Sequence, residues 1–127
     1  MKKSKSESSP NSTAVTVFLF ASLNRLLNEA IERSGRSKKQ EATMRIVDGL
    51  SIQSDLKFEQ LPLAGESSYV GVSLAKTAND ELEGLIAKYK SVNGRRITKA
   101  QAAAACLYEH LSVYHSISEI GKRYKST

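Results

Sequence analysis

The sequence predicts a mainly helical fold with one short two-stranded antiparallel β-ribbon, in which a single chain contains two copies of the same unit. Three patterns support this prediction: apolar residues that alternate as in a strand, apolar stripes at helical spacing, and a glycine followed by a helix-capping sequence. Each pattern occurs twice, in the same order. We therefore divide the chain at the repeat before interpreting any single motif.

Each copy is predicted to begin with a strand, because apolar residues alternate there with a period of two. The first run, AVTVFLFA from Ala14 to Ala21, is too short to span a bilayer, although the lysines before it weakly resemble the start of a signal peptide. The residues expected to face the core are Val15, Val17 and Leu19 in the first strand and Val70, Val72 and Leu74 in the second.

Two amphipathic helices are predicted to follow each strand. Their apolar residues recur at positions i, i+3, i+4 and i+7, which places them on one helical face. In the first helix of each copy these residues are Leu23, Leu26, Leu27 and Ala30, and then Leu82, Leu85, Ile86 and Tyr89. In the second helix they are Thr43, Ile46, Val47 and Leu50, and then Ala104, Leu107, Tyr108 and Leu111.

A glycine and a capping box separate the two helices of each copy. Gly35 and Gly94 are expected to end the first helices. The segments Ser37–Gln40 and Thr98–Gln101 both have the Ser/Thr-x-x-Gln pattern, in which the hydroxyl and the amide side chain cap a helix reciprocally. The second turn is longer than the first by two residues, which lie within Arg95–Ile97.

The beginnings of the first helices are less alike. The second copy has four more residues between its strand and its first helical stripe, which is enough for about one additional helical turn. Thr77–Asp80 has the composition of an N-cap there, whereas Ser22 is a weak candidate in the first copy.

The repeat also predicts how the chain is divided. The polar, basic first thirteen residues resemble a disordered arm, and a stretch with Pro62 and Gly65 resembles a connection between the copies. The connection is expected to be pinned to the core by Leu56, Phe58, Leu61 and Leu63. The predicted division is an arm at 1–13, a first unit at 14–52, the connection at 53–68, a second unit at 69–115 and a tail at 116–127.

Composition limits the function. The chain has 127 residues, 40% of them hydrophobic, which is sufficient for one compact core and small for an enzyme. Its 19 Lys and Arg against 13 Asp and Glu give a formal net charge of +6, which favours a polyanionic partner. Cys106 is the only cysteine, so an intramolecular disulfide framework and a multi-cysteine zinc site are excluded, and a cytoplasmic location is expected.

Two copies can complete a core that one copy cannot. A lone strand leaves its backbone hydrogen bonds unsatisfied, and a helix pair attached to it leaves an apolar face exposed. If the strands around Thr16 and Ser73 pair antiparallel, they cover a core made by all four helices, so that the two units form one intertwined domain. This is a tandem ribbon-helix-helix architecture with pseudo-two-fold symmetry, formed by one chain.

A two-stranded ribbon fits the major groove of DNA, where each base pair presents its own pattern of donors, acceptors and methyl groups. The outward-facing residues are therefore candidates for base contacts: Thr16 and Phe18 in the first strand, and Gly71, Ser73 and Ala75 in the second. Phe18 stays open between base contact and core, because Phe18 and Phe20 are both apolar.

The beginnings of the second helices are candidate phosphate sites, because free amides and the positive end of the helix dipole favour anions. Cations beside such an end are unfavourable by about 0.3–1 kcal/mol each unless an anion binds there. The alternative is a pair of solvated basic turns. The candidate phosphate contacts are Arg36, Ser37, Lys38, Lys39, Arg95, Arg96, Thr98 and Lys99.

The segment EAIERSGRSKKQEATMRIVDGL, from Glu29 to Leu50, resembles the TraY proteins of F-like conjugative plasmids. The shared pattern is Glu-Ala, Arg-Ser-Gly-Arg-Ser, Glu-Ala, Arg and Asp-x-Leu. The resemblance implies a cytoplasmic accessory protein with two tandem ribbon-helix-helix units. Such a protein binds and bends double-stranded DNA at the origin of transfer, helps the relaxase nick within the relaxosome, and regulates transcription of the transfer genes. It implies no cofactor, metal or small-molecule substrate.

Three other functions compete with this interpretation. Catalysis is not expected, because there is no cysteine cluster, catalytic carboxylate pair or glycine-rich phosphate loop in the sequence. A ribbon-helix-helix repressor or antitoxin with a toxin as its main partner stays an alternative, although the segment after Tyr114 is short and basic for a toxin-binding tail. Membrane binding by Lys2, Lys3 and Lys5 lacks an apolar anchor.

Overall fold

The computed structural model describes residues 12–113. Its elements are β2 (Ser12–Phe20), α1 (Ala21–Ser34), α2 (Lys38–Ile52), the 3-10 helix η1 (Phe58–Gln60), β3 (Ser67–Ala75), α3 (Lys76–Asn93) and α4 (Lys99–Val113). The prediction of a mainly helical fold with a two-stranded antiparallel sheet is confirmed. The predicted tail and the predicted arm up to residue 11 lie outside the described residues.

The ribbon is the one sheet of the described chain. β2 and β3 pair antiparallel along their whole length, from Ser12 opposite Ala75 to Phe20 opposite Ser67. Both strands begin two residues before the predicted start of their unit, because the pairing continues to the end of each strand. The predicted inward residues are buried except for a half-buried Val70; the buried ones are Val15, Val17, Leu19, Val72 and Leu74.

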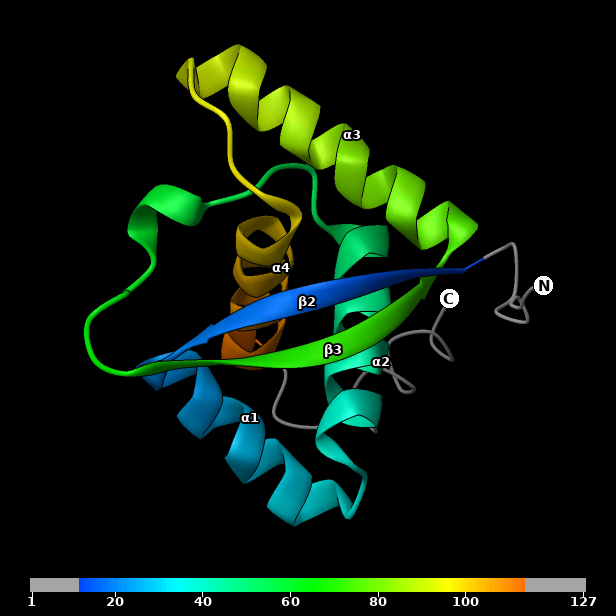
Figure 1. Ribbon diagram of the computed structural model, residues 1–127, viewed down its shortest axis with the longest axis vertical. Coiled ribbons are helices and arrows are strands. Elements are labelled where there is room, and N and C mark those ends of the chain that lie inside the picture. Colours follow the sequence, from blue (N-terminus) through cyan, green and yellow to red (C-terminus); the bar gives the residue numbers. More distant parts are fainter. Residues whose placement is uncertain (1–11, 114–127) are drawn as a thin grey trace, which may run out of the picture.

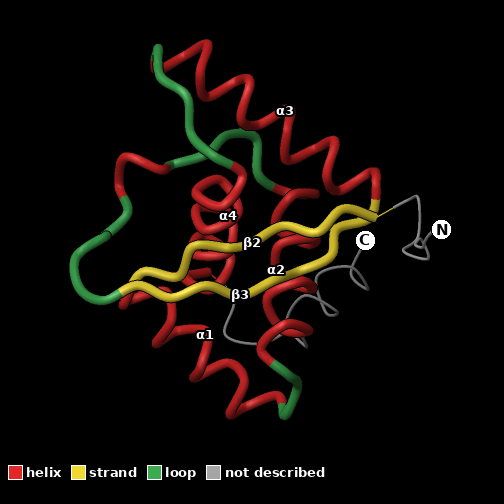
Figure 2. The backbone as a smooth tube through the Cα atoms, viewed as in Figure 1, coloured by secondary structure: helices red, strands yellow, loops and turns green. Residues whose placement is uncertain are grey.

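Beneath this ribbon each strand lies on a helix from the other half of the chain. In Figure 1 the strands cross in front of α2 and α4, and α1 and α3 extend at opposite ends of the molecule. α4 packs against β2, and α2 packs against β3. The tube in Figure 2 shows each strand running directly into a helix without an intervening loop. These contacts between the two halves of the chain make the four helices and the ribbon one body.

Small residues let α2 and α4 approach each other closely. A methyl group on Gly49 of α2 would lie 2.9 Å from Cys106 Sγ of α4. The preceding turn of α4 is equally small and fully buried, with alanine at every position from 102 to 105. Burial raises the pKa of the Cys106 thiol to about 12, and its Sγ lies 3.6 Å from the Ile46 carbonyl oxygen. Cys106 therefore acts as a small packing residue at the crossing.

The glycines and capping boxes between the helices are confirmed. Gly35 and Gly94 have φ values of 78° and 74°, and their amides donate to the last turns of α1 and α3 at 2.8 Å. A residue other than glycine is strained at such φ values. In both capping boxes the hydroxyl accepts from the N3 amide at 3.1 Å, and the N3 glutamine oxygen accepts from the cap amide, for Ser37–Gln40 and Thr98–Gln101.

The predicted caps of the first helices are wrong. α1 begins at Ala21 and α3 at Lys76, so Ser22 and Thr77–Asp80 lie inside the helices, and neither helix has a side-chain cap. Each helix continues directly from a strand, whose last residue holds the extended conformation of an N-cap. The expected additional turn is present: α3 has 18 residues and α1 has 14.

The predicted apolar stripe of α2 is shifted. Thr43 is half-buried and Val47 is 42% exposed, whereas Ala42, Ile46 and Leu50 are buried. The same buried face contains three charged residues: Glu41, Arg45 and Asp48. In the sequence alone, charges at this spacing indicate a solvent-exposed helix face. These charges are paired in the interior: Arg45 bonds Glu41, and His110 of α4 bonds Arg45 and Asp48.

The connection between the copies is only partly attached to the core. Leu56 and Phe58 are buried and Leu61 packs against the core, as predicted. Leu63 is 41% exposed, so its predicted core contact is wrong. It lies after η1, in the stretch that crosses toward β3, where no helix covers the chain (Figure 1).

Candidate nucleic-acid interface

The outward side of the ribbon carries small and polar side chains along most of its length. Alternation places every second residue of a strand on this side. Four of the five predicted base-contact residues are exposed: Thr16, Gly71, Ser73 and Ala75. Thr16 lies opposite Gly71 at the centre of the ribbon, and Ser73 lies opposite the exposed Ala14. This face has room for the edge of a base pair.

Phe18 lies on the outward side but is half-buried. Its ring is 6.1 Å from the ring of Phe20 and 5.8 Å from that of Tyr69, which is its partner across the ribbon. Phe20, by contrast, is fully buried and packs its ring 5.4 Å from that of Tyr108. Phe18 therefore combines a core contact with a surface position, whereas Phe20 belongs to the core.

Tyr69 and Ala14 also lie on the outward side and were missed by sequence reasoning. Tyr69 is 61% exposed and lies two residues before Gly71 on the same side of β3. The sequence signal was the period-two alternation itself, because Tyr69 begins the predicted second unit two residues before Gly71. A large exposed aromatic residue on this side adds an apolar surface at one end of the ribbon.

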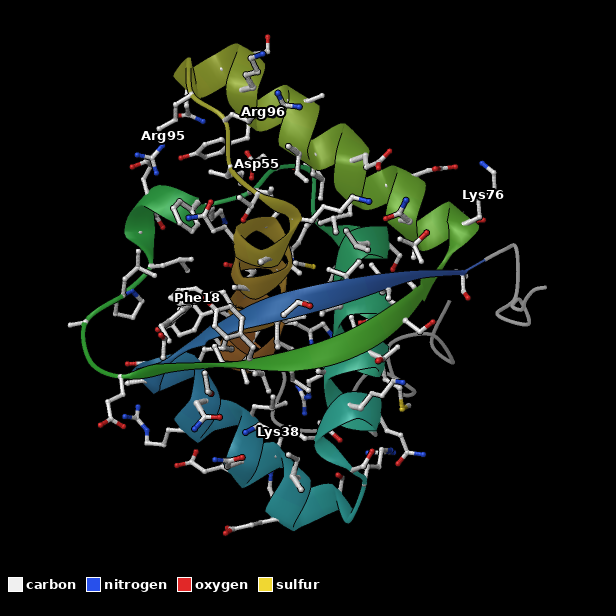
Figure 3. All side chains as sticks on the ribbon, in the orientation of Figure 1. Phe18, Lys38, Asp55, Lys76, Arg95 and Arg96 are labelled. Atoms are coloured by element: carbon white, nitrogen blue, oxygen red, sulfur yellow. The ribbon has the colours of Figure 1, made fainter. Side chains whose placement is uncertain are left out.

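The two basic turns lie on opposite sides of the ribbon. Figure 3 shows Lys38 below the strands and Arg95 and Arg96 above them. The helices that begin at these turns are α2 and α4, which pass beneath the ribbon. A ligand seated on the ribbon therefore has a basic helix N-terminus on either side of it.

Two lysines are held in the same way in both copies. Lys38 Nζ donates to Asn24 Oδ1 at 2.7 Å, and Lys99 Nζ donates to Asn79 Oδ1 at 2.9 Å. Each asparagine is the fourth residue of the first helix of its copy. Lys99 also pairs with Glu83 at 3.0 Å. These bonds orient both ammonium groups at the beginning of the second helix, and sequence reasoning did not identify the asparagines.

Two of the predicted arginines have carboxylate partners within the protein. Arg36 Nη1 is 3.2 Å from Glu41 Oε1, and Arg95 Nε is 3.4 Å from Glu59 Oε2. The Arg95 guanidinium also lies 5.6 Å from the centre of the Phe58 ring. Their charge is already partly neutralised, so both contribute less to an anion site than the sequence suggests.

Lys39 and Arg96 are the most available cations of the predicted set. Both side chains are exposed, and neither forms an ion pair or side-chain hydrogen bond with any residue between 12 and 113. The predicted hydroxyl ligands, Ser37 and Thr98, use an oxygen lone pair to cap their helices and keep a hydroxyl hydrogen for an acceptor. Phosphate oxygens are such acceptors.

A shallow hollow joins the first basic turn to the ribbon. It lies between the beginning of α2 and the exposed side of β3, and its lining residues are Arg36, Lys39, Gln40, Thr43, Met44 and Ser73. One candidate base-contact residue, Ser73, and two candidate phosphate-contact residues, Arg36 and Lys39, thus share one surface.

A buried polar chain connects this surface to the core. Arg45 is fully buried; its Nε lies 2.7 Å from Glu41, and its Nη1 lies 3.3 Å from His110 Nδ1. His110 Nε2 is 2.8 Å from Asp48 Oδ2. Because arginine only donates, Nδ1 of His110 accepts and Nε2–H donates to Asp48. This series of polar side chains runs from α2 to α4 and so joins the two halves of the polypeptide.

The Glu41 carboxylate is ionised within this chain. Burial alone would raise its pKa, but hydrogen bonds from Arg45, Ser34 and Arg36 outweigh burial, and the pKa of Glu41 lies below its ordinary value. Breaking one member of a buried ion pair costs about 3–5 kcal/mol, because the other charge stays buried. Glu41 therefore fixes Arg36 at the turn and Arg45 in the core.

Other kinds of site have less support. Between residues 12 and 113, no three His, Cys, Asp or Glu side chains gather as metal ligands would. A helix with the length and apolarity to cross a membrane is absent from the same part of the chain.

Comparison with known proteins agrees with this geometry. Residues 15–61 match the family model described as the TraY domain, which confirms the resemblance found in the sequence for β2, α1, α2 and the beginning of the connection. The searches of curated proteins and of solved structures returned no match. The family match supports DNA binding in the context of conjugation.

Proposed function

We propose, for a chain whose residues 15–61 form a TraY domain, that the whole described fold is a tandem ribbon-helix-helix unit that binds a specific double-stranded DNA sequence. In this proposal the copies 14–52 and 69–115 are related by a pseudo-two-fold axis, and the DNA is an origin of transfer. The protein bends this DNA, assists the relaxase and other relaxosome proteins in nicking, and regulates transcription of the transfer genes. It acts in the cytoplasm and is not an enzyme.

The observation that carries this proposal is the exposed ribbon with a basic helix N-terminus on either side (Figure 3). The ribbon supplies groups that contact bases, and the turns supply amides and cations that contact phosphates. Anions at these turns would offset the unfavourable cations there, of which Lys39 and Arg96 lack a partner among residues 12–113. Phosphate contacts on both sides of a ribbon also suit a bent duplex.

The first test is binding to a labelled duplex that contains a conjugative origin of transfer and to a scrambled duplex, each at two salt concentrations. We expect strong preference for the origin and a steep decrease of affinity with salt. Equal, weak binding to both duplexes would contradict the proposal and would favour a protein partner.

Substitutions separate the roles of turn and ribbon. Lys39→Ala is expected to weaken binding to both duplexes alike and to flatten the salt slope by about one unit. The control is Lys57→Ala, since Lys57 lies beside the far end of α2, about 20 Å along the helix from Lys39. Thr16→Ala and Ser73→Ala are expected to reduce the preference for the origin and leave the salt slope unchanged. An unchanged salt slope in Lys39→Ala would remove the turn from the interface.

A further inference from the structure

The centre of the ribbon follows from its register. Both strands have nine residues, so Ser12 corresponds to Ser67 and Phe20 to Ala75 in the two copies. Thr16 then corresponds to Gly71, and these two residues are also paired across the ribbon. The pseudo-two-fold axis of the proposed architecture therefore passes through this pair, with one half of the ribbon on each side of it.

The two halves present different chemistry to a ligand. On one side of the axis Phe18 lies opposite Tyr69, with ring centres 5.8 Å apart and Tyr69 61% exposed. On the other side the corresponding pair is Ser73 opposite Ala14, both exposed. The axis relates Phe18 to Ser73 and Tyr69 to Ala14. One half of the ribbon is thus apolar and bulky, and the other is small and partly polar.

We propose that the Phe18–Tyr69 pair contacts thymine methyl groups at one end of the binding site and so fixes the direction in which the protein lies on the DNA. This inference rests on the proposed function, because it requires the ribbon to enter the major groove. The C5 methyl of thymine is the apolar feature that this groove offers, and aromatic side chains contact it. The Ser73 hydroxyl can contact several bases and selects less strongly.

The basic turns cannot produce this directionality. Phosphate contacts position a protein on the duplex but do not distinguish bases. The two turns differ in length, yet both end in the same capping box and the same lysine–asparagine bond. A preference for different bases at the two ends of the site must therefore come from the ribbon, where Phe18 and Tyr69 have no aromatic counterparts.

The test is selection of bound duplexes by the full chain from a random-sequence library. The wild-type protein is expected to select a site without two-fold symmetry that has thymines at one end. Replacing a contacted thymine by uracil, which removes only the methyl group, is expected to weaken wild-type binding about fourfold. In Tyr69→Ala and in the double variant, the same replacement is expected to change affinity less than twofold.

The double variant Phe18→Ser, Tyr69→Ala gives both halves of the ribbon the same serine–alanine pair. It is expected to select a site with two-fold symmetry outside the central step. Tyr69→Ala alone serves as the second variant, because Tyr69 is largely exposed and its removal leaves the core intact. Circular dichroism verifies the fold of both proteins.

The outcomes separate this inference from the function on which it rests. A symmetric wild-type site, or an asymmetric site that stays unchanged in both variants, would overturn the aromatic reader while leaving sequence-specific binding in place. Wild-type protein that selects no sequence at all would overturn the proposed function, and the aromatic reader with it.

Discussion

At the crossing of α2 and α4, we predict that the effect of Gly49→Ala on stability changes sign when Cys106 is replaced by alanine. Gly49→Ala adds a methyl group 2.9 Å from Cys106 Sγ and 3.0 Å from Gln53 Nε2. The Gln53 amide donates to the Cys106 carbonyl oxygen at 3.1 Å but ends a flexible side chain, whereas Cys106 is fully buried. Overpacking a core destabilises the fold by about 1–3 kcal/mol, whereas replacing glycine by alanine within a helix stabilises it by about 1 kcal/mol. We expect a net loss of about 1 kcal/mol in the free energy of unfolding.

Removing the sulfur should reverse this effect. In a Cys106→Ala background the added methyl group occupies the space left by Sγ, so Gly49→Ala should stabilise by about 1 kcal/mol through helix propensity. The coupling energy is then about 2 kcal/mol, within the range found for residues in contact. Gly84→Ala in α3 is the control, since nothing lies within 4 Å of the added carbon, and it should stabilise in both backgrounds.

The assay is urea unfolding of the full chain, followed by circular dichroism, with the two single variants and the double variant measured together. Linear extrapolation yields each free energy of unfolding. If Gly49→Ala changes this free energy equally with and without the sulfur, contact with Cys106 Sγ is not what disfavours a side chain at position 49. The reasoning is then refuted.

Three further predictions concern the polar chain, the thiol and the second turn. Glu41→Gln should lower the free energy of unfolding by about 3 kcal/mol at pH 7, since Arg45 loses its carboxylate. Because the pKa of Glu41 is lowered in the folded protein, this contribution is lost as the pH falls through that pKa, so wild type and variant should converge in acid, as measured by urea unfolding against pH. Cys106, with its pKa raised to about 12, should react with a thiol reagent at pH 8 only after unfolding. Gly94→Ala should cost about 1 kcal/mol through backbone strain alone, because its surroundings are open, and a cost near zero in urea unfolding would contradict this.

Sequence reasoning succeeded where the determining interactions are local. Strand alternation, the glycines at the helix ends and the capping boxes each depend on residues within four positions of one another, and the structure has them as predicted. The additional turn of α3 was also predictable, because it follows from the number of residues between the strand and the helical stripe.

The buried face of α2 could not be predicted in this way. Glu41, Arg45 and Asp48 have the spacing and charge of a solvated helix face, but Arg45 pairs with Glu41, and His110 bonds both Arg45 and Asp48. His110 is 65 residues from Arg45 in the sequence and approaches it only because α2 and α4 pack together. The partner of Lys38 was missed because Asn24 lies 14 residues away on the preceding helix and meets it only when α1 and α2 pack together.

The segment that carries the family resemblance therefore combines buried residues with the exposed basic turn around Lys39. Glu41, Arg45 and Asp48 belong to the resembling segment. All three are buried, in the polar side-chain network that joins α2 to α4. The exposed ribbon residues lie outside that segment. The resemblance in that segment thus concerns the first turn and the helices beneath the ribbon, whereas the family match at 15–61 also includes most of β2. In the proposed function the bases are contacted by the ribbon face, where Tyr69 is the largest exposed side chain.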